Sequence, residues 1–227
     1  MQPYFVPYIG YFQLLKEVDT FVLADNYEYS KGGWINRNRI LNQERIRFLT
    51  LPLEASSDFS LINEKKISKD FVGEKSLNLI VESYRRSPYF SEVIPLVESI
   101  LLFSERNLFH FVFHSLKQMS QSLEIKTNIM LTSQFELPHS LSGKDKIIKI
   151  CQEIGAVEYI NLPGGKSIYN KNDFSDQGVD LKFLKVNDHV YPQVSNVFVP
   201  NLSVLDVLFH VGITRTLNDY MSKYSTE

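Results

Sequence analysis

Cysteine is nearly absent from this chain of 227 residues, in which Cys151 is the only one. A single cysteine forms no internal disulfide, which excludes a small secreted domain held together by disulfide bonds. Cys151 lies in a helical pattern with no histidine or asparagine close to it in the sequence, so it does not suggest a catalytic nucleophile. A reducing compartment suits such a chain, and we expect it in the cytoplasm.

Long apolar runs and an excess of one charge are also lacking. No stretch of about 18 apolar residues is present, and the first residues lack the basic segment and cleavage site of a signal peptide, so no membrane insertion is expected. Lysine and arginine number 24 against 26 aspartates and glutamates, which gives a net charge of −2. Without a basic excess to bind phosphate backbones, nucleic acid is not an expected partner.

Hydrophobic residues make up 44% of the chain, enough for one sizeable core, and their spacing alternates between helical and strand periods. Helices are predicted over 11–18, 72–86, 91–103, 106–123, 144–154 and 203–212, and strands over 20–25, 46–54, 126–133, 157–162 and 179–186. Strand, helix and strand within 126–162 indicate a crossover between parallel strands. We predict a single α/β domain over residues 1–227, with a mainly parallel, Rossmann-like sheet and a helical insertion at about 71–123.

The first twelve residues, MQPYFVPYIGYF, carry five aromatic rings, two prolines and one glycine but no charged side chain. Pro3 and Pro7 fix the backbone φ angle, and Gly10 permits close approach at the start of a helix, where free N–H groups attract anions. Such a loop follows a strand in α/β folds, so we expect a short apolar strand before Met1 in the natural protein. We also expect residues 1–10 to be buried, because exposed they would form an unusually large apolar patch. An ordinary aromatic plug beneath the first helix is the alternative.

The most polar segment of the sequence, residues 25–39, follows the strand predicted at 20–25. An indole stacks on a sugar ring or a base, a guanidinium suits a diphosphate, and asparagine amides suit sugar hydroxyls. The side chains of this segment that could bind a substrate or move a proton are Asp25, Lys31, Trp34, Asn36, Arg37 and Asn38. An exposed hairpin with ordinary surface charges is the alternative interpretation.

Residues four apart on two predicted helices supply further candidates. Asp206 and His210 could form an orienting carboxylate and imidazole, although a capped, packed helix explains them as well. His110 and His114 share this spacing, but the glutamate of a metalloprotease site is missing, so no metal site is predicted. Weaker candidates for a ligand-facing turn are Gly164 and Gly165 with Lys166 and Tyr169 nearby, and Tyr191 with Gln193.

Four blocks of the sequence resemble the WbqC-like family. They are MQPYFVPYIGYFQLL at the start, VDTFVLADNYEYSKGGWINRNRIL at 18–41, SPYF at 87–90 and LSVLDVLFHVG at 202–212. That family is associated with bacterial O-antigen gene clusters, so the resemblance implies a cytoplasmic role in making surface polysaccharide or lipopolysaccharide. It also implies a short strand before the glutamine-proline loop.

The loop FVPYIGY resembles, more weakly, the F-x-P-x-H-x-G-H loop of the nucleotidylyltransferase superfamily. Tyr8 and Tyr11 stand where that motif has its two histidines. A neutral phenol is a weaker donor to phosphate than an imidazolium, which weakens the case for nucleotidyl transfer but leaves a nucleotide-shaped pocket.

Three classes of function follow from these observations. The first, which we predict, is a transferase that forms an amide between a nucleotide-linked amino sugar and an acyl or aminoacyl group. The second is a nucleotidylyltransferase-like enzyme that binds a nucleotide, and the third is a non-catalytic accessory protein of polysaccharide assembly. The expected ligands are a nucleotide-linked sugar and a carrier-bound acyl donor, and an acyl-carrier protein is a candidate partner.

We predict that the candidate residues converge on one pocket, because loops after neighbouring parallel strands meet at one edge of a sheet. The predicted substrate-binding residues are Gln2, Tyr8, Tyr11, Trp34, Asn36, Arg37 and Asn38, and the predicted catalytic residues are Asp25, Lys31, Asp206 and His210. Asp206 or His210 is expected on the far wall of that pocket.

Overall fold

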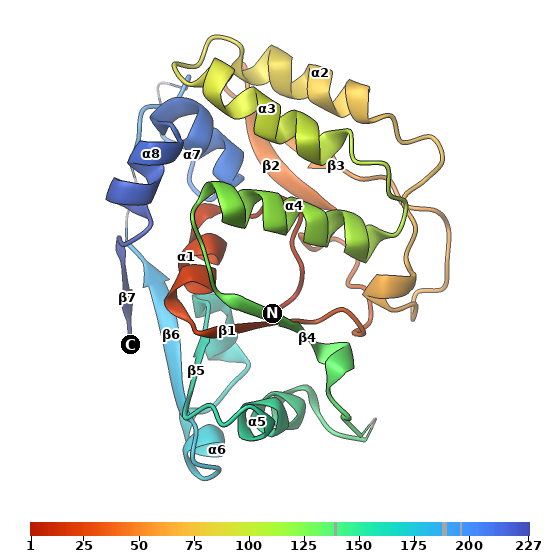
Figure 1. The fold of residues 1–227 in the computed structure, drawn as a ribbon, viewed down its shortest axis with the longest axis vertical. Coiled ribbons are helices and arrows are strands. Elements are labelled where there is room, and N and C mark those ends of the chain that lie inside the picture. Colours follow the sequence, from red (N-terminus) through yellow and green to blue (C-terminus); the bar gives the residue numbers. More distant parts are fainter. Residues whose placement is uncertain (139, 188–189, 196) are drawn as a thin grey trace.

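The structure is a computed structural model that describes residues 1–138, 140–187, 190–195 and 197–227. The first half of the chain forms α1 (Ile9–Glu17), β1 (Thr20–Leu23), β2 (Arg37–Asn42), β3 (Arg45–Thr50), α2 (Gly73–Tyr84), α3 (Phe90–Leu101) and α4 (Leu108–Ser122). The second half forms β4 (Asn128–Leu131), α5 (Gly143–Glu153), β5 (Glu158–Asn161), α6 (Lys171–Ser175), β6 (Asp180–Val186), α7 (Val204–Val211), α8 (Ile213–Arg215) and β7 (Tyr224–Thr226). Figure 1 shows α2 and α3 at one end of the molecule and α5 and α6 at the other.

The described strands form three small sheets. β1 pairs in parallel with β4, and β5 pairs in parallel with β6, while β7 runs antiparallel along the other edge of β6. β2 and β3 form a separate antiparallel hairpin. The predicted α/β class with parallel pairing is therefore confirmed.

The crossover predicted within residues 126–162 does not join two strands that pair with each other. The sequence predicts a crossover from the strand at 126–133, through a helix, to a parallel partner at 157–162. The three elements are present as β4, α5 and β5, but β4 pairs with β1 and β5 pairs with β6. Residues 24–127 connect β1 to its parallel partner β4, and the segment that contains α6 connects β5 to its parallel partner β6.

The predicted helical insertion is present as α2, α3 and α4, which pack successively against one another beside the β2–β3 hairpin (Figure 1). Helix α4 begins where Asn107 accepts a hydrogen bond from the backbone N–H of His110, which satisfies one of the free donors at a helix N-terminus. The buried faces of these helices join α1 and α7 in one large core. Its largest fully buried side chains include Tyr11, Tyr84, Phe5, Phe12, Phe111 and Phe209.

A second, smaller hydrophobic cluster lies around β5 and β6. Its buried side chains are Ile148, Cys151, Phe174, Val179, Leu181 and Phe183. Burial raises the pKa of the Cys151 thiol to about 11, so this cysteine stays protonated and packs as an apolar side chain.

The N-terminal loop is buried, as the sequence predicts, and its backbone is held by β2 and by the start of α7. The Phe5 carbonyl accepts from the Asn38 amide at 3.0 Å, and the Val6 carbonyl accepts from the Ser203 hydroxyl at 2.7 Å. The Pro7 carbonyl accepts from the Val204 N–H at 2.8 Å. Val6 has a φ of 37°, which is strained for a β-branched residue and persists because the neighbouring bonds fix it.

Replacing Ser203 by alanine should destabilise the protein more than replacing Ser142, the side-chain cap of α5. Both serines cap a helix, but only Ser203 also donates to a buried carbonyl, that of Val6. We expect Ser203→Ala to lower the free energy of unfolding by roughly 2–4 kcal/mol and Ser142→Ala by about 1 kcal/mol. Urea denaturation of both variants measures this, and equal losses would contradict the clamp on the N-terminal loop.

Candidate functional site

A cavity of about 760 Å³ lies between β1 and β5 and extends past the carboxyl ends of both strands. Its outer part is lined by residues that follow strands: Tyr27 after β1, Thr132 after β4, and Gly164 and Tyr169 after β5. Gln2 completes this outer part, which we call the outer crevice. Ligands of open α/β sheets bind outside the carboxyl ends of the strands, and the outer crevice has this position.

Aromatic and neutral polar side chains dominate the outer crevice. Burial raises the pKa of Tyr27, and the nearby Tyr169 hydroxyl raises it further. Both phenols therefore stay protonated at neutral pH and can donate hydrogen bonds while their rings offer apolar faces. The Lys146 ammonium lies 5.5 Å from the centre of the Tyr27 ring. Such a lining suits a sugar or base ring that carries hydroxyl or amide groups.

The two glycines after β5 have different roles. A Cβ atom on Gly165 would lie 2.7 Å from the Asn161 side-chain nitrogen and 3.3 Å from the Phe183 ring, so a larger residue there would displace the Asn161 amide. A Cβ atom on Gly164 would meet no heavy atom within 4 Å, although Gly164 lines the cavity. Gly165 thus packs the turn against the strands, and Gly164 leaves space for a ligand.

Asp25 adjoins the outer crevice through Thr132. Its Oδ1 atom lies 2.9 Å from the Thr132 hydroxyl and accepts the Ser133 N–H at 2.9 Å. The Asp25 side chain is buried and is not among the residues that line the cavity. The carboxylate therefore positions the turn after β4, and through it the Thr132 hydroxyl, at the crevice wall.

The glutamine-proline loop contributes Gln2 to the crevice, but neither predicted tyrosine. Tyr11 is fully buried, and its hydroxyl donates to the Gln2 carbonyl at 2.9 Å, so it fixes the backbone beside the crevice. Tyr8 is half-buried, and its ring lies against Gly10. Burial raises the pKa of Tyr8 to about 12, which keeps it neutral.

The predicted residues between Lys31 and Asn38 are held by contacts within the protein, and none of them is among the residues lining the cavity. Lys31 pairs with Asp58 at 2.5 Å on the surface, and the Arg37 guanidinium donates to the Gly32 carbonyl at 2.6 Å. Trp34 stacks on Phe48, with ring centres 6.5 Å apart.

The two asparagines of this segment use their amides to connect strands and loops. Asn36 accepts from the Tyr29 hydroxyl at 2.8 Å and donates to the Leu51 carbonyl at 2.9 Å. Asn38 donates to Phe5, as described for the N-terminal loop. The structure therefore places Trp34 and Asn38 beside Phe5 of the N-terminal loop, whereas Gln2 lines the crevice and Asp25 adjoins it through Thr132.

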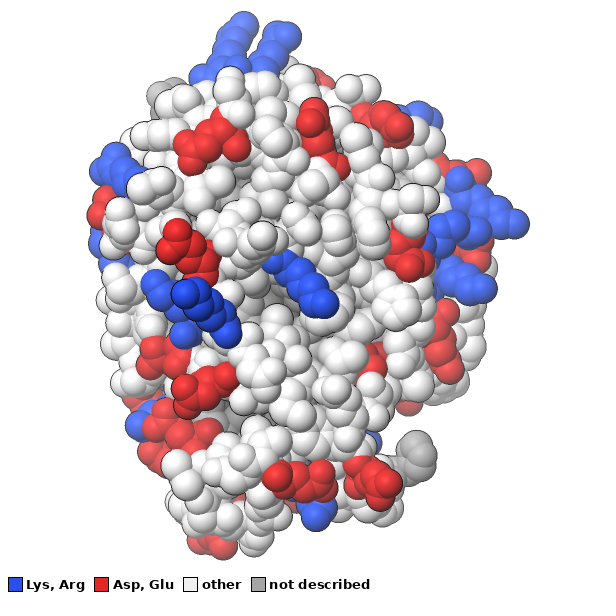
Figure 2. All heavy atoms as spheres, viewed as in Figure 1, with Lys and Arg blue, Asp and Glu red and all other residues white. Residues whose placement is uncertain are grey.

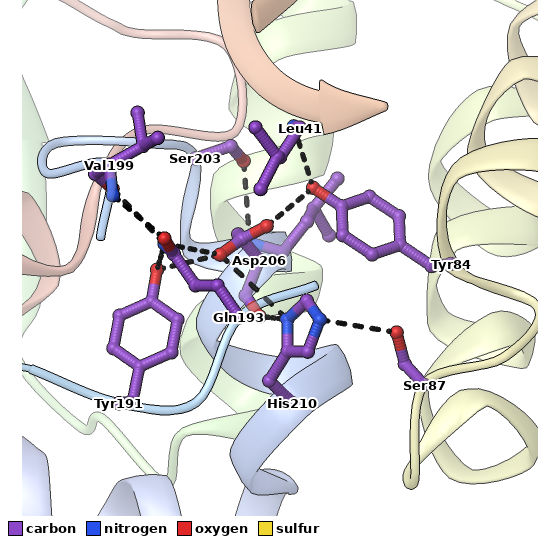
Figure 3. Close-up of polar contacts among 10 residues, drawn as sticks. Leu41, Tyr84, Ser87, Tyr191, Gln193, Val199, Ser203, Asp206 and His210 are labelled. Carbon is purple, nitrogen blue, oxygen red and sulfur yellow. Dashed lines mark hydrogen bonds and ion pairs between the residues drawn. The ribbon is translucent and has the colours of Figure 1, made fainter. Parts of the chain in front are cut away.

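Asp206 and His210 belong to a second, buried cluster (Figure 3). Asp206 Oδ1 accepts from the Tyr84 hydroxyl at 3.0 Å, and Oδ2 accepts from Tyr191 at 2.8 Å and from the Gln193 amide at 2.9 Å. His210 Nδ1 lies 3.8 Å from the Asp206 carboxylate. The weaker candidates Tyr191 and Gln193 thus have a defined role, which is to satisfy a buried carboxylate.

The same cluster connects α7 to the helical layer and to the loop before it. The Tyr84 hydroxyl accepts from the Leu41 N–H at 3.2 Å, and His210 Nε2 lies 3.5 Å from the Ser87 hydroxyl. Both polar atoms of the Gln193 amide are bonded: the nitrogen donates to Asp206, and Oε1 accepts from the Val199 N–H at 2.8 Å. Burial raises the pKa of Asp206, and His210 and the hydrogen-bond donors offset part of this increase.

The described residues contain no group of three or more histidine, cysteine, aspartate or glutamate side chains placed to hold a metal ion. On the face shown in Figure 2, basic side chains stand among acidic ones rather than merging into one broad patch. A bilayer-spanning helix is not found in the described part of the chain.

The sequence profile of the WbqC-like protein family matches residues 2–217, nearly the whole described fold. The chain belongs to the WbqC-like family. An uncharacterized protein of Mycobacterium tuberculosis, Rv1507c, is 27% identical over 216 residues, which cover 93% of this chain and 92% of the relative. No solved structure matches the chain.

The blocks that carry the WbqC-like resemblance pack on one another. Tyr89, in SPYF, lies against Gly212, where a Cβ atom would be 2.6 Å from the tyrosine ring, and its N–H donates to Phe209 at 3.2 Å. The N-terminal block meets the LSVLDVLFHVG block through Val6 and Ser203. Of the crevice residues, Gln2 and Tyr27 lie in the first two of these blocks, and Tyr169 is one of the weaker candidates from the sequence. Thr132 has only its place at a strand end as a signal.

The contribution of Asp206 to the free energy of unfolding should decrease as the pH rises. Its pKa in the fold is above its ordinary value of 3.8, so the folded chain binds the proton more tightly than the unfolded chain. Stability from this group is therefore present below about pH 4 and is lost as the pH rises through the folded pKa. We expect the free energy of unfolding of the wild type, minus that of Asp206→Asn, to decrease as the pH is raised from 4 to 8. Urea denaturation across this range measures it, and curves that run parallel would contradict the assignment.

Proposed function

We propose that this WbqC-like protein binds a nucleotide-linked amino sugar in the outer crevice and transfers an acyl or aminoacyl group to its amine. Family membership supports a role in polysaccharide biosynthesis. In this reaction the sugar nitrogen attacks the acyl carbonyl carbon, the bond from that carbon to the carrier sulfur breaks, and the proton lost from nitrogen leaves with the thiolate. The product is an amide, and the donor is a carrier-bound thioester.

The observation that carries the proposal is the chemistry of the crevice lining. Tyr27 and Tyr169 provide ring faces and neutral hydroxyl donors, and the Gln2 backbone is fixed at the rim by Tyr11. Gly164 leaves open space beside them. Rings with hydroxyl groups are the ligands that such a combination binds best.

Among the predicted catalytic residues, Asp25 is the one hydrogen-bonded to a crevice residue, Thr132. A carboxylate that fixes a threonine hydroxyl can orient it toward an attacking amine or take up its proton. Asp206 and His210 do not line the cavity, so we place them in the supporting framework.

The two alternative functions predict different outcomes. A nucleotidylyltransferase would need phosphate donors in place of the two motif histidines, but the Tyr11 hydroxyl is buried on a carbonyl and Tyr8 does not line the cavity. An accessory protein would bind the nucleotide sugar without consuming it. Two incubations followed by mass spectrometry separate these cases. With a nucleotide-linked amino sugar and an acyl thioester, amide transfer adds the acyl mass to the sugar; with an amino-sugar phosphate and a nucleoside triphosphate, nucleotidyl transfer adds a nucleotide to the sugar phosphate and releases pyrophosphate.

Gly164→Leu should weaken binding of a nucleoside-diphosphate-linked amino sugar at least tenfold, or about 1.4 kcal/mol, because the new side chain fills the crevice. Gly143→Leu is the matched control: a Cβ atom at either glycine meets no heavy atom within 4 Å, but Gly143 does not line the cavity. Isothermal titration of wild type and both variants provides the dissociation constants.

Arg37→Ala tests, in the same titration, whether the segment between Lys31 and Asn38 binds the ligand instead. Its guanidinium is bonded to the Gly32 and Gly33 carbonyls outside the cavity lining, so we expect an unchanged dissociation constant. Weakened binding in Arg37→Ala together with normal binding in Gly164→Leu would move the site to the segment between Lys31 and Asn38.

A further inference from the structure

Strand β3 has an outer edge, the one facing away from β2, which no described strand covers along residues 46–50. β2 pairs with the inner edge of β3 in an antiparallel ladder. At the end of this ladder the Leu51 N–H donates to the Asn36 carbonyl at 2.8 Å. Because the backbone groups of successive residues alternate between the two edges, those of Ile46, Phe48 and Thr50 point outward. No hydrogen bond from another described residue reaches them, so they are free strand donors and acceptors.

The outer edge is already paired where the chain continues beyond β3. The Pro52 carbonyl accepts from the Ser68 N–H at 2.7 Å, and the Glu54 N–H donates to the Lys66 carbonyl at 2.9 Å. Residues 66–68 thus act as a neighbouring strand for residues 52–54, and this pairing ends at Ser68. The outer edge of residues 46–50 is the unfilled continuation of the same ladder, long enough for a strand of about five residues.

One face of the β3 edge is apolar and aromatic. Ile46 and Phe48 are 45% and 48% exposed, and Phe48 stacks on Trp34. The Arg37 guanidinium lies 4.9 Å from the centre of the Phe48 ring, and the Arg39 guanidinium lies 5.5 Å from the Trp34 ring. Cation–π contacts of this kind hold the two charges over the aromatic face. The face therefore offers apolar surface next to positive charge.

The opposite face of β3 carries further positive charge. Arg45 and Arg47 are exposed and alternate with Ile46 and Phe48, so their side chains lie on the other face of the strand. No described carboxylate forms an ion pair with either of them, or with the two arginines stacked on the rings. The edge is therefore basic, although the whole chain has a net charge of −2. Charge complementarity favours an acidic ligand at this edge.

We propose that the outer edge of β3 binds an extended acidic segment of a partner protein, which adds a third strand to the β2–β3 hairpin. The backbone of this segment pairs with the outward N–H and carbonyl groups of β3. Side chains of paired strands share a face, so its apolar residues lie beside Phe48 and its carboxylates beside Arg45 and Arg47. The partner segment is thus one in which acidic and apolar residues alternate.

A peptide strand suits this edge better than a membrane or a second copy of the chain. Free backbone groups need hydrogen-bond partners, which a strand supplies and a hydrocarbon layer does not. A second β3 would bring its own Arg45 and Arg47 to the same edge, and like charges across a strand pair are destabilising. None of the residues of this edge lines the cavity, so the partner segment and the crevice ligand have separate sites.

Two synthetic peptides of about eight residues test the charge of the partner, one alternating glutamate with valine and the other alternating lysine with valine. We expect the glutamate peptide to bind about tenfold more tightly, as measured by fluorescence anisotropy. The double variant Arg45→Glu/Arg47→Glu should reverse this preference, and its new binding of the lysine peptide would also show that it is folded. Equal affinities of the wild type for the two peptides, or an unreversed preference, would overturn the proposal.

Backbone methylation of the glutamate peptide tests whether it binds as a strand. The N–H groups of its valines point to one edge and those of its glutamates to the other, so only one set can pair with β3. We expect N-methylation of the two central residues of one type to abolish binding, while N-methylation of the other type leaves the affinity unchanged. Loss of the valine N–H groups identifies an antiparallel strand, and loss of the glutamate N–H groups a parallel one. Equal effects of the two methylations would exclude a strand.

Phe48→Ala locates the peptide on β3, and Phe59→Ala is the matched control. Phe59 is 76% exposed, more than Phe48, but lies outside β3. We expect Phe48→Ala to weaken binding of the glutamate peptide about fivefold and Phe59→Ala to leave it unchanged. Equal effects of the two substitutions would show that the peptide binds elsewhere.

Two other occupants of the edge would give different results with the same variant. Binding of the protein to phosphatidylglycerol vesicles that Phe48→Ala abolishes, without binding of either peptide, would assign the edge to a membrane. A dimer of the unliganded protein that Phe48→Ala dissociates in analytical ultracentrifugation would assign it to a second copy. Either result would overturn the acidic partner.

Discussion

Three successive backbone carbonyls, those of Phe5, Val6 and Pro7, must be satisfied away from water, and the fold depends on how this is done. Each accepts a hydrogen bond from a different residue: Asn38 at the start of β2, and Ser203 and Val204 at the start of α7. A buried carbonyl without a donor costs about 1–3 kcal/mol, so these bonds fix the hairpin and α7 relative to α1. They also hold Val6 in its strained conformation. The position of Gln2 at the crevice follows from this arrangement.

The buried Asp206 cluster extends the same framework. Helix α7 begins at the clamped loop, and within its first turn the Asp206 carboxylate meets hydroxyl donors from α2 and from the loop that carries Tyr191. A carboxylate removed from water is tolerated only when several donors surround it, so each of these segments has one permitted position. The sequence blocks typical of the WbqC-like family thus build the support of the site. The same blocks also supply Gln2 and Tyr27 to the lining of the crevice, and the rest of the outer lining comes from segments that follow β4 and β5.

Local patterns were sufficient for the longer helices, α1 to α5 and α7, and for most strands, because helical and strand periods of apolar residues report burial directly. The short helices α6 and α8 were not predicted. Local patterns did not predict the contacts of the polar segment at residues 25–39, which follows β1. Asn36, Arg37 and Asn38 all look like ligand-binding side chains in the sequence, but their partners are Leu51, Gly32 and Phe5. Two of these partners are more than ten residues away, and the choice among them is set by tertiary packing. The strand pairing of β4 and β5 was missed for the same reason, since neighbours in sequence found other partners in space.

The chemistry of the crevice limits how it would recognise the nucleotide sugar that we propose as its ligand. The described lining contains no lysine, arginine or histidine side chain, so ionic bonds from the walls cannot supply most of the binding energy of a diphosphate. Backbone N–H groups of a glycine-containing turn can bind phosphate oxygens without a full positive charge, and Lys146, beside Tyr27, is placed to add one charge at the rim. In the proposed complex, side-chain recognition would therefore come from contacts of the Tyr27 and Tyr169 phenols with the sugar and base rings. Stacking and neutral hydrogen bonds are weakly screened by salt, so the affinity of such a site depends on ring identity much more than on ionic strength.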